Sequence, residues 1–168
     1  MSNRRDIVIE ANGEKLAAWL YQPNEGDRHP LIVMSHGFSA IMAMGLDDYA
    51  ASFAAAGFAV LVYDHRNYGA SSGWPRHETD PWRQVEDMRA VISHGRNLAC
   101  VDPERIGSIG GSAGGHLAAM IGVCGPDAEL EPPAPYPGVS SKVHAAVFMY
   151  GLANLLDWVC RGKQVFAD

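Results

Sequence analysis

The hydrophobic positions of the chain form unbroken runs, and each run is followed by a glycine or a polar residue. Continuous runs, rather than alternating ones, are typical of strands that are buried on both faces of a parallel sheet. They occupy Pro30–Ser35, Phe58–Tyr63, Ile106–Ile109 and Val143–Tyr150. Ahead of them, Asn12-Gly13 separates Asp6–Ala11 from Glu14–Tyr21, which is the signature of an antiparallel hairpin. The pattern predicts a mostly parallel sheet that begins with an antiparallel hairpin.

Apolar residues at helical spacing predict a helix in each gap between the parallel strands. The first helix runs from Leu46 to Ala54 and ends at Gly57, because glycine commonly caps helices. The second follows Pro81, and a third covers His116–Val123. On the second helix we expect three charged residues to face water, namely Arg83, Glu86 and Arg89. The alternation predicts one α/β domain over residues 1–168, a three-layer α/β/α sandwich with right-handed crossovers.

Composition narrows the classes of protein that fit this fold. Hydrophobic residues make up 48% of the chain and charged residues 19%, as in globular domains. A net charge of −6 and a sequence pI near 5.6 argue against general binding to nucleic acids or to anionic membranes. No apolar run approaches the roughly 20 residues of a membrane helix, and the start of the chain shows no secretory leader. We therefore expect a cytoplasmic protein with reduced cysteines and with no membrane or nucleic-acid partner.

One motif carries the candidate chemistry. Gly110-Gly111-Ser112-Ala113-Gly114 fits the pattern G-x-S-x-G and lies between a predicted strand and a predicted helix. In such a turn the positions two before and two after the serine need to be nearly free of side chains, and Gly110 and Gly114 meet this need. The hydroxyl then projects at the start of a helix, where free backbone N–H groups favour negative charge. The motif predicts that Ser112 is a nucleophile.

Two further segments follow predicted strands, in the order that such a site requires. His36-Gly37-Phe38 ends one strand at the point where an oxyanion hole needs a backbone N–H. We therefore expect the backbone amides of Phe38 and Ala113 to be the two oxyanion donors. The loop after the next strand begins at Asp64, and we expect Asp64 and Arg66 to form a structural ion pair.

With these motifs in place, the chain resembles the serine esterases of the α/β-hydrolase superfamily over about Leu31–Leu155. The first half is similar to dienelactone-hydrolase-like and peptidase-like members through residues 36–40 and the loop 64–73. The second half is similar to carbohydrate-esterase and lipase-like members through residues 110–119. The resemblance implies an α/β-hydrolase fold, an ester substrate, Ser112 as nucleophile, and Phe38 and Ala113 as oxyanion donors. We expect no cofactor and no metal.

The chain departs from that family after Ser112. Family members present the acid and then the histidine on loops after later strands, whereas the sequence here shows one strand after the serine. We therefore expect the last strands of the fold to be absent. His36 is expected to orient its own loop, and His65 to pack beside the turn after its strand. The base and the acid are not identified, and the weak candidates are His77, His116 and Asp157.

Two hypotheses for the function follow. In the first, the chain is a carboxylic-ester hydrolase that acts on small-molecule esters with a serine nucleophile, weakly if its base and acid are incomplete. In the second, it is a catalytically impaired α/β-hydrolase fragment that serves as a binding or assembly module. In both, a sheet that ends at Val143–Tyr150 leaves an apolar edge unpaired, so we expect a homo-oligomer joined through that edge.

Two features near the expected site keep alternatives open. Met42 and Met44 either line an apolar pocket or fill the core. The proline-rich segment Pro126–Pro137 is either a stiff surface connection or a lid at the active-site end of the sheet.

Overall fold

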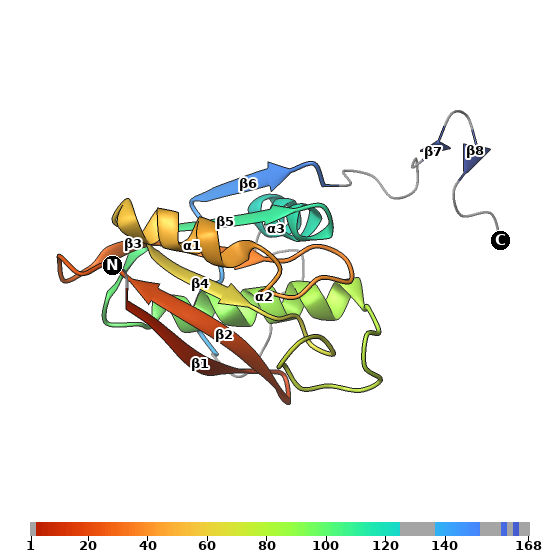
Figure 1. Ribbon diagram of the computed structural model, residues 1–168, viewed down its shortest axis with the longest axis horizontal. Coiled ribbons are helices and arrows are strands. Elements are labelled where there is room, and N and C mark those ends of the chain that lie inside the picture. Colours follow the sequence, from red (N-terminus) through yellow and green to blue (C-terminus); the bar gives the residue numbers. More distant parts are fainter. Residues whose placement is uncertain (1–2, 125–136, 152–158, 161–162, 165–168) are drawn as a thin grey trace.

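A six-stranded sheet forms the centre of the structure (Figure 1), a computed structural model that describes residues 3–124, 137–151, 159–160 and 163–164. Its strands are β1 (Asn3–Ala11), β2 (Glu14–Gln22), β3 (His29–Ser35), β4 (Ala59–Tyr63), β5 (Val101–Gly111) and β6 (Ala145–Met149). A separate two-stranded sheet contains β7 (Val159–Cys160) and β8 (Lys163–Gln164), which the sequence did not predict. The helices are α1 (Leu46–Ala55), α2 (Pro81–Arg96) and α3 (Ala113–Val123). None of these described helices has the length and the apolar character of a membrane span.

The strand order is β1-β2-β4-β3-β5-β6. β1 and β2 pair antiparallel around Asn12 and Gly13, both of which have positive φ, so the predicted hairpin is confirmed. β2 also pairs antiparallel with β4, whereas β3, β4, β5 and β6 are parallel to one another. The predicted mostly parallel sheet is therefore present, with its carboxyl edge at the ends of β3, β4, β5 and β6.

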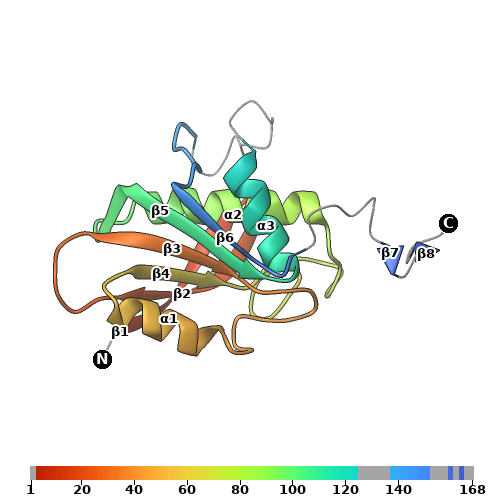
Figure 2. The same ribbon diagram turned by 90° about the horizontal axis from the view of Figure 1, so that it is seen from above.

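Two hydrophobic clusters, one on each face of the sheet, make the fold three layers thick. Figure 2 shows α1 on one face and α2 and α3 on the other. The cluster under α1 contains Met34, Val60 and Val62, which point to one side of their strands. The cluster under α2 and α3 contains Val33 and Leu61, which alternate with them along the same strands. Helices on both faces explain why these strands read as continuous apolar runs.

The prediction that Arg89 faces water is wrong. Its side chain is 2% exposed and donates hydrogen bonds to the hydroxyl of Ser141 (3.0 Å) and to the carbonyl of Cys124 (3.3 Å). The segment that precedes β6 also reaches α2 at Ser93, whose hydroxyl donates to the Val139 carbonyl at 3.2 Å. Because this segment covers α2, a position that looks solvent-facing on an isolated helix is buried.

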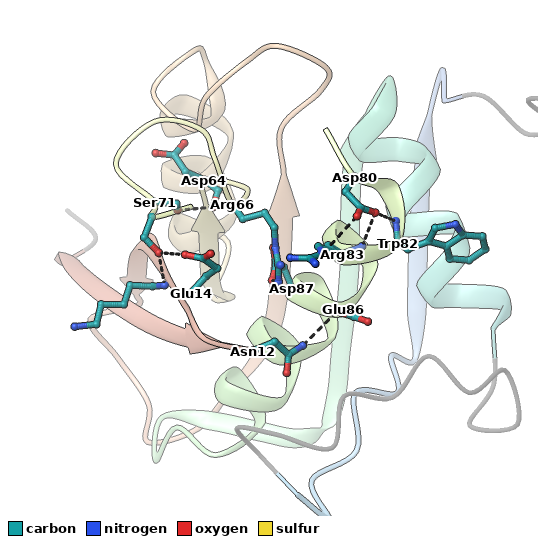
Figure 3. Close-up of polar contacts among 12 residues, drawn as sticks. Asn12, Glu14, Asp64, Arg66, Ser71, Asp80, Trp82, Arg83, Glu86 and Asp87 are labelled. Atoms are coloured by element: carbon teal, nitrogen blue, oxygen red, sulfur yellow. Dashed lines mark hydrogen bonds and ion pairs between the residues drawn. The ribbon is translucent and has the colours of Figure 1, made fainter. Parts of the chain in front are cut away.

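The predicted ion pair between Asp64 and Arg66 is also wrong. Arg66 instead binds Asp87 of α2 through two hydrogen bonds of 2.7 and 2.5 Å, with both side chains buried (Figure 3). Asp64 accepts hydrogen bonds from the backbone N–H groups of Met42 (2.7 Å) and Ala70 (2.9 Å). Arg66 and Asp87 therefore tie the loop after β4 to α2, and Asp64 ties that loop to the one after β3.

Burial and charge pairing act against each other on the carboxylate of Asp87. Burial raises its pKa above the ordinary aspartate value, although the hydrogen bonds from Arg66 oppose this shift. The same pairing raises the pKa of Arg66. Each of the two buried charges is compensated only by the other, so both residues have to be present for the pair to stabilise the fold.

Replacing Asp87 with asparagine keeps the shape of the side chain but leaves the charge of Arg66 buried without a counter-ion. Removing one partner of a buried pair costs about 3–5 kcal/mol. We expect a loss of this size in the free energy of unfolding, measured by urea denaturation near neutral pH.

Asp80→Asn is the matched control on the same helix. Asp80 caps α2 by accepting from the backbone N–H groups of Trp82 and Arg83, and asparagine caps helices about equally well. Its ion pair with Arg83 is exposed and contributes little. Equal losses in the two variants would contradict a special role for the buried pair.

Candidate active site

Ser112 stands at the turn between β5 and α3, at the carboxyl edge of the sheet. Its backbone has φ 55° and ψ −121°, a positive-φ conformation that residues other than glycine rarely adopt. The residue is exposed. Ala113 follows as the first residue of α3, so its N–H has no partner within the helix. The turn presents an exposed hydroxyl at a helix N-terminus, which is the geometry that the motif predicts.

Two glycines make this turn sterically possible. A Cβ on Gly110 would lie 2.2 Å from the carbonyl oxygen of Gly114. A Cβ on Gly114 would lie 2.4 Å from the carbonyl oxygen of Ser35 and 2.7 Å from that of His36. Any larger residue at either position would push α3 away from the ends of β5 and β3. The predicted need for glycine on both sides of Ser112 is therefore confirmed.

The segment after β3 approaches Ser112 through Gly37. A Cβ on Gly37 would lie 3.4 Å from the Cβ of Ser112 and 4.0 Å from its Oγ. The Gly37 carbonyl accepts hydrogen bonds from Nδ1 of His36 (2.9 Å) and from the backbone N–H of Ala40 (3.2 Å). In a trans peptide the C=O and the following N–H point in opposite directions. These two bonds therefore orient the backbone N–H of Phe38.

Both predicted oxyanion donors lie around one small hollow. Phe38 and Ala113 line it together with His36 and His65, and its volume is about 10 Å³. The structure thus brings together the two residues that the sequence named, on the turns after β3 and β5. Their role as donors to a developing oxyanion stays a prediction.

His36 and His65 form an interlocked pair beside this hollow. Nε2 of His36 accepts a hydrogen bond from the His65 backbone N–H (3.1 Å), and Nε2 of His65 lies 3.3 Å from the His36 carbonyl oxygen, to which it donates. The rings meet edge to face with their centroids 4.3 Å apart. Because Nε2 of His36 accepts, neutral His36 carries its proton on Nδ1, which donates to Gly37. His36 orients its own loop and His65 packs beside the turn after β4, as predicted.

Burial keeps both rings neutral. Desolvation lowers the pKa of His36. Desolvation is also the main reason why the pKa of His65 lies well below 6.5, and the neighbouring His36 ring adds to this shift. Within the described residues, Nδ1 of His65 is buried without a hydrogen-bond partner. A second proton on His36 would remove the acceptor for the His65 N–H and place a charge in this buried site. Both rings are therefore suited to hold the loops in place.

Contacts are described for the two candidate histidines named from the sequence, and neither of these contacts pairs a ring with the Ser112 hydroxyl. His77 is exposed and its ring packs edge-on against Tyr68, with centroids 5.7 Å apart. His116 lies one turn along α3, where its backbone N–H donates to the Ser112 carbonyl (3.1 Å). Asp157 and residues 126–136 of the proline-rich segment fall outside the described residues. Across the described ranges, neither a base nor an acid is assigned.

A larger cavity opens beside Ser112 on the side of α1. Its volume is about 240 Å³, and residues from the loop before α1 and from the end of β6 line it. Met44 lines this cavity and is 65% exposed, whereas Met42 is 6% exposed and packs in the core under α1. Of the two alternatives for these methionines, Met44 therefore lines the pocket and Met42 fills the core.

Sequence reasoning missed Tyr49 and Tyr150, which also line the cavity. Tyr150 carried a usable signal, because it directly follows the last apolar run and ligands of α/β sheets bind at the carboxyl ends of strands. No group of three or more His, Cys, Asp or Glu residues that would hold a metal occurs among the described side chains.

The chain matches one protein-family profile and several curated proteins. The profile of the BD-FAE family matches residues 19–167. The quorum-quenching protein AidA of Acinetobacter baumannii (strain MDR-ZJ06) is 40% identical over 130 residues, which cover 71% of this chain and 43% of that protein. The chain spans 34–43% of the length of the curated relatives it matches.

Solved structures show the same fold. The alpha/beta hydrolase GrgF from Penicillium sp. sh18 is 29% identical, with a TM-score of 0.68 over 73% of this chain and 42% of that chain. Thermogutta terrifontis esterase 2 phosphorylated by paraoxon is 25% identical, with a TM-score of 0.76 over 98% of this chain and 62% of that chain.

The lowered pKa values of His36 and His65 predict that acid destabilises the fold. Each ring stays neutral when folded but takes up a proton in the unfolded chain as the pH falls below about 6.5. The unfolded state then binds more protons, so we expect the free energy of unfolding to fall between about pH 7.5 and pH 5.5. His65→Asn removes one of these groups and is expected to flatten the fall, measured by urea denaturation at each pH.

The control for this experiment is His77→Asn, because His77 is exposed and asparagine tolerates its φ of 67°. It is expected to keep the wild-type slope. His94, whose pKa burial also lowers, accounts for part of the slope that remains in His65→Asn. An unchanged slope in His65→Asn would show that the histidine pair does not titrate as described.

Proposed function

The chain belongs to the BD-FAE family of α/β-hydrolases, and from this premise we propose that it is a carboxylic-ester hydrolase with Ser112 as its nucleophile. The α/β-hydrolase relationship predicted from the sequence is confirmed. The observation that carries the proposal is the positive-φ backbone of Ser112, which exposes its side chain at the start of α3. Because the curated relatives are longer than this chain, their own activities are no more than a guide.

The proposed reaction follows from the groups around Ser112. The Oγ attacks the carbonyl carbon of the ester, and its proton passes to a base as the C–O bond to Oγ forms. The carbonyl oxygen becomes an oxyanion, which the Phe38 and Ala113 N–H groups stabilise; one such donor contributes about 3 kcal/mol. The bond between the carbonyl carbon and the alkoxy oxygen then breaks, and the base returns its proton to the departing alcohol. Water next attacks the acyl carbon and gives a proton to the base. The bond to Oγ breaks, the acid is released, and Oγ takes the proton back.

The proton acceptor is the part of the mechanism that the contacts of the described residues do not identify. Of the imidazoles that line the two hollows beside the turn, His36 has both nitrogens engaged and His65 is buried and neutral. A serine hydrolase deprived of triad members still exceeds the uncatalysed rate by about 10³–10⁴ through its oxyanion hole and substrate binding. We therefore propose measurable hydrolysis of activated esters by this chain.

The competing proposal is that the chain is a catalytically impaired binding or assembly module. The two proposals differ in the reactivity of Ser112, so a fluorophosphonate probe followed by mass spectrometry separates them. We expect covalent labelling of Ser112 and hydrolysis of p-nitrophenyl butyrate, both lost in Ser112→Ala. Ser52→Ala, which alters an exposed serine on α1, is the control and is expected to retain both. Hydrolysis that persists in Ser112→Ala would refute the assignment.

We also propose that two copies of the chain associate through β6. In the described part of the chain this strand is at the end of the sheet, and Val147 and Phe148 are 49% and 40% exposed. The opposite edge, β1, carries charged side chains that discourage pairing, whereas Ala145–Met149 has none. Pairing β6 with its own copy around a two-fold axis would satisfy both edges at once.

Light scattering during size-exclusion chromatography tests this association. We expect a dimer for the wild type and a monomer for Val147→Lys, since lysine on an edge strand opposes pairing. Val8→Lys, on the opposite edge at a position that is 60% exposed, is the control and is expected to remain a dimer. A monodisperse wild-type monomer would exclude the proposed assembly.

A further inference from the structure

The cavity beside Ser112 is apolar on most of its wall. Apolar and aromatic side chains from well-separated parts of the chain line it, among them Met44, Leu46, Tyr49, Ile109, Met149 and Tyr150. No charged residue lines the cavity within the described ranges. Such a wall favours a hydrocarbon group over a sugar, a phosphate or a charged group.

The polar side chains of the wall other than Ser112 and the two tyrosines are already engaged. Ser35 donates through its hydroxyl to the carbonyl of Gly114 (3.2 Å). Both ring nitrogens of His36 form hydrogen bonds with the backbone. The catalytic hydroxyl therefore borders a space in which these groups do not compete for a ligand.

Tyr150 connects the cavity wall to the nucleophile. A Cβ on Gly111 would lie 2.7 Å from the Tyr150 hydroxyl, so the phenol ring reaches across the residue that precedes Ser112. Met149, the residue before Tyr150, accepts a hydrogen bond through its carbonyl from the backbone N–H of Ser112 (3.0 Å). Tyr150 itself has φ 42° and is 80% exposed. A strained backbone that presents an exposed aromatic ring beside a nucleophile is typical of a substrate contact.

The size of the cavity sets the size of the group. An apolar cavity of about 150 Å³ accepts benzene, which corresponds to roughly 25 Å³ per carbon atom. At that ratio a cavity of about 240 Å³ has room for on the order of nine carbon atoms. Met44 in the loop before α1 and Tyr49 on α1 are exposed at 65% and 57%, and they form the outer part of the wall.

We propose that this cavity binds an unbranched or monoaromatic hydrocarbon group of the ester, up to about nine carbon atoms long, and that Met44, Tyr49 and Tyr150 determine that limit. The proposal rests on the ester-hydrolase function proposed above and adds the class of substrate. An acyl chain and an alcohol chain share this chemistry, so the test has one arm for each.

The test uses two series of esters with the full chain. One series is p-nitrophenyl esters from acetate to dodecanoate, and the other is acetate esters from methyl to decyl. Met44→Trp fills the cavity, and since one methylene changes specificity roughly 10-fold or more, we expect kcat/KM for six-carbon groups to fall at least 10-fold. The acetyl and methyl members are expected to change less than 3-fold. Tyr49→Ala is expected to shift the optimum to longer groups.

The series that responds identifies which side of the ester occupies the cavity. Trp82→Ala, which removes an exposed aromatic side chain outside the cavity, is the control and is expected to leave both profiles unchanged. Parallel losses across all lengths in Met44→Trp would overturn the proposal, as would profiles that do not move.

A binding measurement separates this proposal from the catalytic one. 2-Octanone, an unreactive ketone of the shape of an ester, is titrated into Ser112→Ala while backbone amide resonances are followed by NMR. Shifts at residues 44–49 and 109–112 that Met44→Trp abolishes would support the cavity even if no ester were hydrolysed. Absence of such shifts would refute the cavity whether or not esters are hydrolysed.

Discussion

The close contact between backbones at Gly110 and Gly114 is the constraint on which the rest of the site depends. At this point the end of β5, the first turn of α3 and the end of β3 approach so closely that neither glycine has space for a methyl group. The contact sets the distance between the start of α3 and the sheet, and it leaves space only for a tight turn between β5 and α3. Ser112 consequently adopts a positive φ, and its N–H reaches the Met149 carbonyl of β6. Three parallel strands thus meet at one serine.

Buried polar groups then hold the loops that surround this turn. A loop has backbone N–H and C=O groups that no strand or helix satisfies, and burying them unpaired costs free energy. Asp64 accepts two such N–H groups, and the two histidines bind the backbone of each other's loops. Gly69 is needed because a Cβ there would lie 1.9 Å from the Asp64 carboxylate. The orientation of the Phe38 amide therefore depends on buried side chains that hold these loops, His36 among them.

Short patterns of adjacent residues predicted the fold, but they did not predict the polar contacts between residues distant in sequence. The continuous apolar runs, Asn12-Gly13 and Gly57 each reflect a property of a few adjacent residues, so the elements they predict are present. Arg66 and Arg89 failed as predictions because their partners, Asp87 and Ser141, are distant in sequence and depend on which segment covers α2. Asp87 did carry a signal, since it lies four residues before Val91 on the buried face of α2. The cavity at Ser112 appeared in the sequence only as one of two alternatives for Met42 and Met44, because its walls come from three separate segments.

The backbone of Ser112 also bears on which of the two functions fits this chain. A non-glycine residue in such a conformation carries strain of about 1–3 kcal/mol, and glycine would occupy the same turn with less. A module that only binds or assembles gains nothing from serine at this position, since the hydroxyl contributes nothing to the contact between the strands. The hydroxyl does have a use where it stands: it is exposed, it adjoins the first N–H of α3 and the Phe38 loop, and it borders an apolar cavity. The strain at Ser112 therefore favours a chemical role for its hydroxyl over a purely structural role for the turn. This argument does not depend on which residue receives the proton.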